Sequence, residues 1–194
     1  MNLNYNLILA DPPWPQTAYA KGNRSVTNQY DTMTINEICD LPVGDLAAKD
    51  CILALWITGP HLDKIPLIMD SWGFKFGGSL FVWLKIAKNV PNNYVYGLGF
   101  YTRKNAEFLV YGKRGTPGRP IKALNELVFA PRGKHSAKPY EFYSYLEGMW
   151  THAKRVELFA RNNKKGWDAW GNEKNVRYKL SLMEKLGDNR FYDH

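Results

Sequence analysis

Short apolar runs, separated by polar stretches rich in glycine or proline, divide the chain into segments of strand and helix length. Residues 5–10 and 51–58 are mostly apolar, and we predict that both are buried strands. Residues 74–85 are rich in β-forming side chains and contain the pair Gly77-Gly78, which is typical of a kinked strand. Four shorter strands are predicted at residues 107–112, 127–130, 155–159 and 167–170.

Helical segments are predicted between these strands. Thr34 and Glu37 have the spacing of a capping box, which predicts a helix that leads to Cys39. Pro66 breaks a second helical segment, at residues 59–72, or delays its start. Two further helices are predicted, at residues 140–150 with Pro139 as the first helical position, and at residues 174–186.

Strands that alternate with helices indicate an α/β fold, in which a mostly parallel sheet carries helices on both faces. We expect one domain over residues 1–194, because no linker or internal repeat interrupts the pattern. In such sheets, ligands bind beyond the carboxyl ends of the strands. The motif Asp11-Pro12-Pro13-Trp14 comes directly after the first predicted strand, so we expect a site there.

Composition narrows the class of protein. The two cysteines, Cys39 and Cys51, fit neither the spacing of a metal site nor a disulfide framework. No apolar run reaches the roughly 18 residues that span a bilayer, and the first residues lack the pattern of a signal peptide. We therefore expect a cytoplasmic protein with no bound metal and no contact with a membrane.

The net charge of +8 is concentrated in one segment. Residues 85–138 contain eleven Lys or Arg against two acids, a net charge of +9, whereas the rest of the chain carries −1. A basic zone of this kind attracts phosphate backbones, and its loops are where we expect substrate recognition. From charge alone, a solvated basic face is an equally good explanation.

The motif after the first strand suits the methylation of an exocyclic amine on a base. The lone pair of such an amine is delocalised into the ring, which makes the nitrogen a poor nucleophile. The Asp11 carboxylate and the Pro12 carbonyl oxygen could each accept one N–H hydrogen bond and favour a tetrahedral nitrogen. Pro13 stiffens this turn, and Trp14 could stack on a base extruded from its strand. The alternative is a rigid turn in which Trp14 belongs to the core.

Eight motifs in a fixed order extend this interpretation to most of the chain. They are "ADPPW" (10–14), "YDTMTINEI" (30–38), "LALWITG" (53–59), "GFKFGGSLFVWLK" (73–85), "GLGFYTRKNAEFLVYGKRG" (97–115), "HSAKPYEFY" (135–143), "RVELFARN" (155–162) and "WDAWGN" (167–172). With these motifs the chain resembles the DPPW-type N6-adenine methyltransferases. This family includes the eukaryotic mRNA adenosine methyltransferase and many bacterial and phage DNA enzymes.

The resemblance implies a Rossmann-like methyltransferase fold with S-adenosylmethionine (SAM) as the methyl donor. It also implies a permuted order, with the catalytic strand first and the cofactor strand last. This order accounts for the absence of a GxGxxG motif near the N-terminus. Catalytic roles then belong to Asp11, Pro12, Pro13 and Trp14.

Cofactor contacts are also implied by the resemblance. Asp11 faces the methionine end of SAM as well as the target amine, and Lys138 pairs with the carboxylate of the cofactor. Lys138 could instead be a helix-terminal lysine without a role. Glu157 is a cofactor-side acid or a core acid paired with Arg161 or Lys138. The remaining matches to the cofactor side are Arg161, Asn162, Asn163, Asn172 and Glu173.

Substrate contacts are expected from an aromatic side chain and from the basic loops. Tyr30 is expected to shape a loop near the target base, together with residues 32–34, although helix capping explains Thr34 equally well. His135 is close to Lys138 in the sequence and is a further candidate, whereas Trp56 and Trp83 are expected in the core. Contacts to backbone phosphates are expected from Arg103, Lys113, Arg114, Arg119 and Lys122.

The leading hypothesis is a SAM-dependent N6-adenine methyltransferase that acts on DNA in a bacterial or phage-infected cytoplasm, by base flipping and direct methyl transfer. An RNA adenine methyltransferase is the alternative with the same chemistry, and N4-cytosine methylation is a third. A catalytically inactive nucleic-acid-binding partner is a different class of protein. Asp11 is present, which argues against that class. The sequence does not decide whether the protein forms a homodimer.

Overall fold

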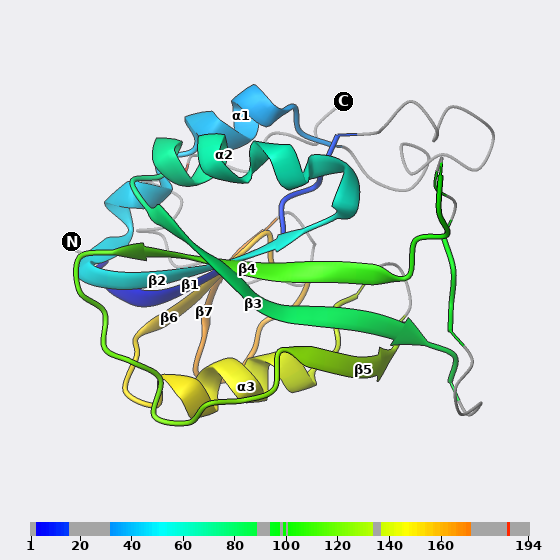
Figure 1. The fold of residues 1–194 in the computed structure, drawn as a ribbon. Coiled ribbons are helices and arrows are strands. Elements are labelled where there is room, and N and C mark those ends of the chain that lie inside the picture. The colour runs from blue at the N-terminus through cyan, green and yellow to red at the C-terminus, as the bar shows by residue number, and fades with distance from the viewer. Residues whose placement is uncertain are drawn as a thin grey trace.

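One mixed sheet organises the chain, with the strand order β5-β3-β4-β2-β1-β6-β7 (Figure 1). The structure, a computed structural model, describes residues 3–15, 32–88, 94–97, 99, 101–133, 137–171 and 186. The strands are Tyr5–Ala10 (β1), Ala47–Ile57 (β2), Lys75–Ile86 (β3), Ala106–Arg114 (β4), Leu127–Pro131 (β5), Arg155–Leu158 (β6) and Asp168–Trp170 (β7).

Strand β4 runs against its neighbours in an otherwise parallel sheet. β1 pairs in parallel with β2 and β6, β6 with β7, and β3 with β5, whereas β4 is antiparallel to both β2 and β3. Six strands therefore end at one edge of the sheet, and β4 begins there. We call this the carboxyl edge. The predicted α/β class is confirmed, and the sheet is mixed, because β3 and β4 are antiparallel neighbours, a pairing that needs no helical crossover between them.

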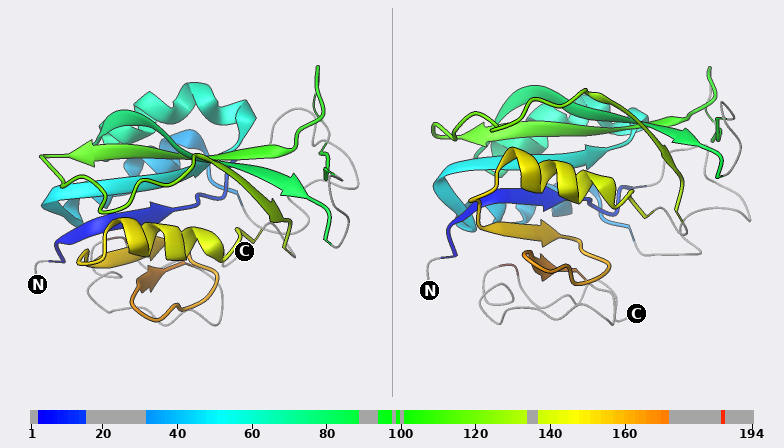
Figure 2. Two further views of the ribbon diagram at one scale, coloured as in Figure 1. Left: turned by 60° about the horizontal axis from the view of Figure 1, so that its bottom comes forward. Right: turned by 90° about the horizontal axis from the view of Figure 1, so that it is seen from below.

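Helices cover both faces of the sheet, as predicted (Figures 1 and 2). α1 (Ile35–Asp40) and α2 (Ile65–Ser71) lie on one face, and α3 (Glu141–Met149) lies on the other. Two short 3-10 helices, η3 (Val43–Asp45) and η4 (Gly59–Lys64), flank β2 in the sequence.

The ends of the helices follow local sequence signals. The Thr34 hydroxyl accepts a hydrogen bond from the Glu37 N–H, and the Glu37 carboxylate accepts one from the Thr34 N–H, which confirms the capping box. Pro66 lies in the first turn of α2, which begins only after η4, as predicted. Pro139 was predicted to be the first helical residue. Instead it lies one residue before the N-cap of α3, Tyr140.

The core has two layers because β1 and β2 are apolar on both faces. Ile8 and Leu53 pack toward α1 and α2 in one cluster, whereas Leu7 and Ile52 pack toward α3 in the other. The predicted burial of Trp56 and Trp83 is confirmed, since their exposed fractions are 2% and 1%.

Strand β3 shows the predicted kink. Its register against β4 shifts between Phe76 and Gly78, and Gly78 has a φ of 137°, which favours glycine. The helix predicted at residues 174–186 lies outside the described residues apart from Leu186, which is helical and buried. In the part of the chain that the structure describes, no helix is both long and apolar enough to cross a membrane.

Candidate active site

The turn after β1 places Asp11 at the centre of the carboxyl edge. Ala10, the last residue of β1, is paired with Leu55 of β2 and with Leu158 of β6. The carbonyl oxygen of Pro13 accepts a hydrogen bond of 2.9 Å from the N–H of Met33, which ties the turn to the chain ahead of α1. A stiff turn with an anchored carbonyl holds the Asp11 carboxylate in one direction.

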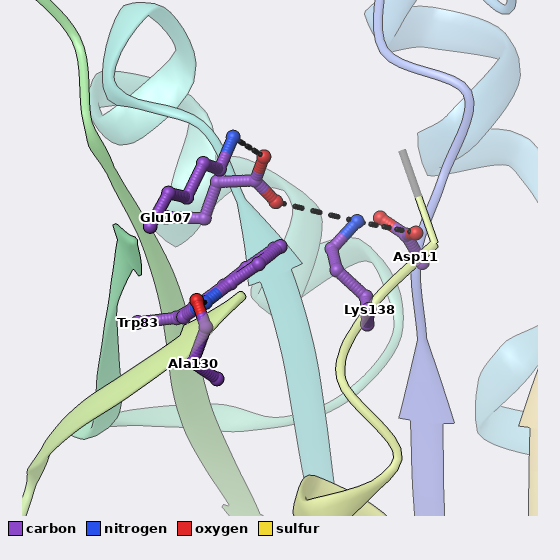
Figure 3. A network of polar contacts seen from close by, with 6 residues as sticks. Asp11, Trp83, Glu107, Ala130 and Lys138 are labelled. Atoms are coloured by element: carbon purple, nitrogen blue, oxygen red, sulfur yellow. Dashed lines mark hydrogen bonds and ion pairs between the residues drawn. The ribbon is translucent and has the colours of Figure 1, made fainter. Parts of the chain in front are cut away.

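A chain of alternating charges runs from Asp11 to β3 (Figure 3). Lys138 Nζ is 2.6 Å from Asp11 Oδ2 and 3.4 Å from Glu107 Oε2, so the ammonium bridges two carboxylates. Lys85 donates to the other oxygen of Glu107. The side chains of Asp11, Glu107 and Lys138 are exposed by 21%, 12% and 13%, so water screens these pairs only in part.

The pairing keeps these groups charged despite their burial. For Lys138, burial favours the neutral amine, but Asp11 and Glu107 outweigh it and raise the pKa above its ordinary value. For Glu107, burial alone would raise the pKa, yet Lys138 and Lys85 outweigh it and hold the pKa below its ordinary value. The site therefore presents a fixed cation beside the Asp11 carboxylate.

A cavity of about 380 Å³ opens beside Asp11, between the ends of β1 and β6 and the start of α3. Trp56 forms part of its apolar wall, and Lys138 Nζ lies 5.4 Å from the centre of the Trp56 ring. The volume falls within the range of small-molecule sites. Six of the residues predicted to bind the cofactor line this cavity, namely Asp11, Lys138, Glu157, Arg161, Asn162 and Asn163.

Glu157 is held by a partner that the sequence did not indicate. The Tyr143 hydroxyl on α3 donates a 2.7 Å hydrogen bond to Glu157 Oε1, and both residues line the cavity. Burial is the main reason why the pKa of Glu157 is raised to about 7. Glu157 thus titrates near neutral pH, as groups in functional sites often do.

The backbone changes direction where β6 meets the cavity. Phe159, the residue after β6, has a φ of 62°, which is uncommon for a residue other than glycine. Its ring packs against Trp170 of β7 with centroids 5.3 Å apart, and it also lines the cavity. Such strained positions cluster at ligand sites because the surrounding structure must hold them. Phe159 therefore marks the segment 159–165 as part of the site.

Trp14 already has an aromatic neighbour. Its ring stacks on His61 of η4, with centroids 5.3 Å apart and planes 20° from parallel. His61 Nε2 lies 3.1 Å from the carbonyl oxygen of Pro15, and burial lowers the pKa of His61, so the neutral ring donates this hydrogen bond. The indole is thus fixed by η4, and one face of it is covered.

The structure does not bring four of the predicted phosphate contacts to the carboxyl edge. Lys113 and Arg114, at the end of β4, pair with Ile52 and Cys51 at the start of the apolar part of β2. Because β4 is reversed, this is the opposite edge, roughly 20 Å away at about 3.3 Å per residue. Arg114 also donates to the Gly44 carbonyl and so supports η3.

The basic loop that follows stays at the opposite edge. The Ile121 N–H donates to the carbonyl of Met149, the last residue of α3, and Trp150 Nε1 donates to the Gly118 carbonyl. Arg119 and Lys122 flank Ile121 and therefore lie near the end of α3, away from Asp11. Arg103, by contrast, lies just before β4 and so on the carboxyl edge. Tyr30, His135, Asn172 and Glu173 lie outside the described residues.

Sequence reasoning missed three residues of the site. Glu107 and Lys164 are far from the first motif in the sequence, and Tyr143 looks like an ordinary residue of an amphipathic helix. The sequence carries a signal for Glu107, as it does for Glu157, since an acid inside an apolar strand needs a partner. Lys164 lies over the ring of Tyr140 at 3.6 Å and forms part of the cavity wall.

Comparison with known proteins shows which family the chain belongs to. The family model MT-A70 matches residues 5–173, which span β1 and Asp11 as well as the cavity. The chain belongs to the MT-A70 family of N6-adenine methyltransferases. Members of this family use SAM, and the relatives of the chain include N(6)-adenine-specific methyltransferases.

Individual relatives support membership of this family, and they differ in how much of their own length the chain covers. The type II methyltransferase M.MunI of a Mycoplasma species is 35% identical over 188 residues, which cover 87% of this chain and 77% of that protein. The human N(6)-adenine-specific methyltransferase METTL4 is 30% identical, and the N6-methyladenosine RNA methyltransferase MTA1 of Pyricularia oryzae is 29% identical. The chain spans 37% of METTL4 and 47% of MTA1.

Proposed function

We propose that this protein is a SAM-dependent methyltransferase that transfers a methyl group to the N6 amine of adenine in DNA. The observation that carries the proposal is the position of Asp11. Its carboxylate lies at the end of β1, beside a fixed cation and at the wall of a cavity of about 380 Å³. A carboxylate placed in this way can act on an extruded base on one side and on a cofactor on the other.

The residues of the turn prepare the amine for attack. The Asp11 carboxylate accepts one N–H of the amine and the Pro12 carbonyl accepts the other, so that the nitrogen lone pair is no longer delocalised. Lys138 holds Asp11 Oδ2 at 2.6 Å and thereby fixes the carboxylate. Trp14, stacked on His61, forms a rigid wall against which an extruded base is held.

The cavity suits SAM by the chemistry of its lining. Acidic side chains (Asp11, Glu157) and basic side chains (Lys138, Arg161) line one cavity, which suits a zwitterionic amino acid group. Apolar walls from Trp56 and Phe159 suit an uncharged ring. SAM, when bound, supplies an electrophilic methyl group. Asn162 and Asn163 are proposed to bind its ribose or carboxylate, and Asn172 and Glu173 are proposed to contribute from outside the described residues. The proposal also includes the permuted order of the chain, in which the catalytic strand comes first and the cofactor strand last.

DNA is preferred over RNA as the substrate. M.MunI, the type II methyltransferase of a Mycoplasma species, is matched over 77% of its own length, against 37% for METTL4 and 47% for MTA1. A bacterial or phage cytoplasm is the setting that fits this relative. The name of MTA1 supports RNA as the second candidate substrate, with the same site and the same chemistry.

Nucleoside mass spectrometry tests the choice of substrate. Plasmid DNA and total RNA are each incubated with the protein and SAM, then digested to nucleosides. The proposal predicts N6-methyladenine in DNA. Methylated adenosine in RNA alone would keep the chemistry and overturn the substrate. Absence of both SAM binding and any methylated base would favour an inactive nucleic-acid-binding partner.

A further inference from the structure

A β-hairpin extends the sheet beyond the carboxyl edge, on the side of Asp11. An isolated antiparallel bridge joins Ile86, the last residue of β3, to Tyr94, and a second joins Gly97 to Lys104, two residues before β4 begins. The Val95 N–H also donates to the Lys85 carbonyl, and the Lys104 N–H donates to the Gly97 carbonyl. In Figures 1 and 2 the green segments beyond β3 and β4 project past the sheet.

The described part of this hairpin exposes aromatic rings. Tyr101 is exposed by 91%, Tyr96 by 54% and Tyr94 by 37%. The rings of Tyr94 and Tyr96 lie next to each other, with centroids 6.5 Å apart. Large exposed aromatic side chains gathered on one element are unusual on a protein that needs no partner there.

Cations accompany these rings. Arg103 and Lys104 are exposed on the same hairpin, and Arg132 is exposed after β5 at the same edge. We call Tyr94, Tyr96, Tyr101, Arg103 and Lys104 the hairpin surface. Aromatic rings interleaved with cations are typical of surfaces that bind unpaired nucleotides, because every base can stack and every linkage carries a phosphate.

A small cavity connects the hairpin to the site. It measures about 140 Å³ and lies between the base of the hairpin and the start of η4. Lys85, Lys104 and Arg132 line it, against one acid, Glu107. Glu107 is also paired with Lys138, which lines the cavity beside Asp11, so this ion pair links the two cavities. A strand that delivers a base to Asp11 would therefore pass along the hairpin.

We propose that the hairpin surface binds the nucleic-acid strand that carries the target adenine, with its tyrosines stacking on nucleotides beside the extruded base. The proposal rests on the proposed function and adds the path of the substrate strand to it. The net positive charge of the lining favours a nucleic acid over a second copy of this chain, which also carries a net positive charge.

The test compares two surfaces of the same protein. A fluorescein-labelled oligonucleotide, taken from a sequence that the protein methylates or, failing that, from plasmid DNA, is titrated with protein and followed by anisotropy. The variants are Tyr96→Ala and Tyr101→Ala, singly and together. Ile121→Ala is the matched control, since Ile121 is exposed by 69% but lies at the opposite edge. SAM binding, measured by calorimetry, reports whether each variant keeps an intact site.

Loss of one stacked base is expected to weaken the affinity about 5- to 150-fold. The proposal predicts this loss for the tyrosine variants, unchanged affinity for Ile121→Ala, and SAM binding like that of the wild type throughout. Tyrosine variants that bind the oligonucleotide as the wild type does would overturn it. So would a change from dimer to monomer in light scattering at unchanged affinity, which would identify a self-association surface. Absence of methylation, with binding still dependent on the tyrosines, would contradict the proposed function but support the strand path.

Discussion

At the scale of single residues, burial and charge pairing decide which groups of the site are ionised. Lys138 and Glu107 keep their charges because each faces opposite charges at short range. Glu157 has a hydroxyl partner instead, and burial dominates, so its pKa rises to about 7. The two buried acids Glu107 and Glu157 therefore differ in how their ionisation responds to pH.

Glu157 makes stability depend on pH in a defined window. Between its ordinary pKa of 4.5 and its folded-state value of about 7, the unfolded chain is ionised there while the folded protein holds a proton. Raising the pH through this window therefore lowers the free energy of unfolding, by at most about 1.4 kcal/mol per pH unit and about 3 kcal/mol in total.

The variant Glu157→Gln removes this dependence and keeps an acceptor for Tyr143. We expect urea denaturation to show that Glu157→Gln gains stability relative to the wild type as the pH rises from 4.5 to about 7. Glu141→Gln, at an exposed position of α3, is the control and should follow the wild type. Parallel pH profiles for the wild type and Glu157→Gln would contradict the burial argument.

At the scale of elements, short local signals set the ends of helices and the turns that carry the site. The capping box of α1 satisfies backbone groups at both Thr34 and Glu37. α1 packs against α2 in the core layer that also includes Ile8 and Ala10 of β1. A weaker α1 therefore loosens the layer that supports the turn after β1.

Removing the cap should have a measurable cost. Thr34→Ala is expected to lower the free energy of unfolding by about 1 kcal/mol, because the Glu37 N–H loses its acceptor. Thr34→Ser keeps a hydroxyl at the N-cap and should stay close to the wild type. Equal losses for both variants in denaturant titrations would show that the methyl group, rather than the cap, stabilises the protein.

Features of single elements could be predicted from the sequence, whereas the pairing between distant elements could not. Strand positions, the capping box and the late start of α2 were predictable because each depends on residues close together in the chain. The reversal of β4 was not, since strand direction is set by how distant segments pair. The contacts from Lys138 to Asp11 and from Tyr143 to Glu157 likewise join residues 127 and 14 positions apart. The motifs led to Asp11, Lys138 and Glu157, which line one cavity, but not to their partners Glu107 and Tyr143.

At the scale of the whole molecule, the reversed β4 divides the basic segment between two edges of the sheet. Arg103, Lys104 and Arg132 lie at the carboxyl edge, whereas Lys113, Arg119 and Lys122 lie at the opposite edge. The sequence presents these charges as one zone, and the fold separates them. A nucleic acid that places a base at Asp11 is therefore expected to contact the basic residues of the carboxyl edge, not those of the opposite edge.

The salt dependence of binding should distinguish the two groups. Each phosphate contact releases about one counterion, so Arg103→Ala is expected to reduce the slope of log affinity against log salt by about 1. Arg119→Ala, an equal change of charge at the opposite edge, should leave the slope unchanged. Titrations with labelled DNA at several salt concentrations measure both. A reduced slope for Arg119→Ala alone would show that DNA follows the opposite edge.

The central claim is that the Asp11 carboxylate activates an adenine amine for methyl transfer. The most direct measurement follows a deuterium-labelled methyl group from SAM into plasmid DNA, by nucleoside mass spectrometry, for the wild type, Asp11→Asn and Arg119→Ala. We expect labelled N6-methyladenine with the wild type and Arg119→Ala, and a yield lower by a factor of about 100 or more with folded Asp11→Asn. Equal yields with Asp11→Asn, or label in cytosine instead of adenine, would contradict the claim.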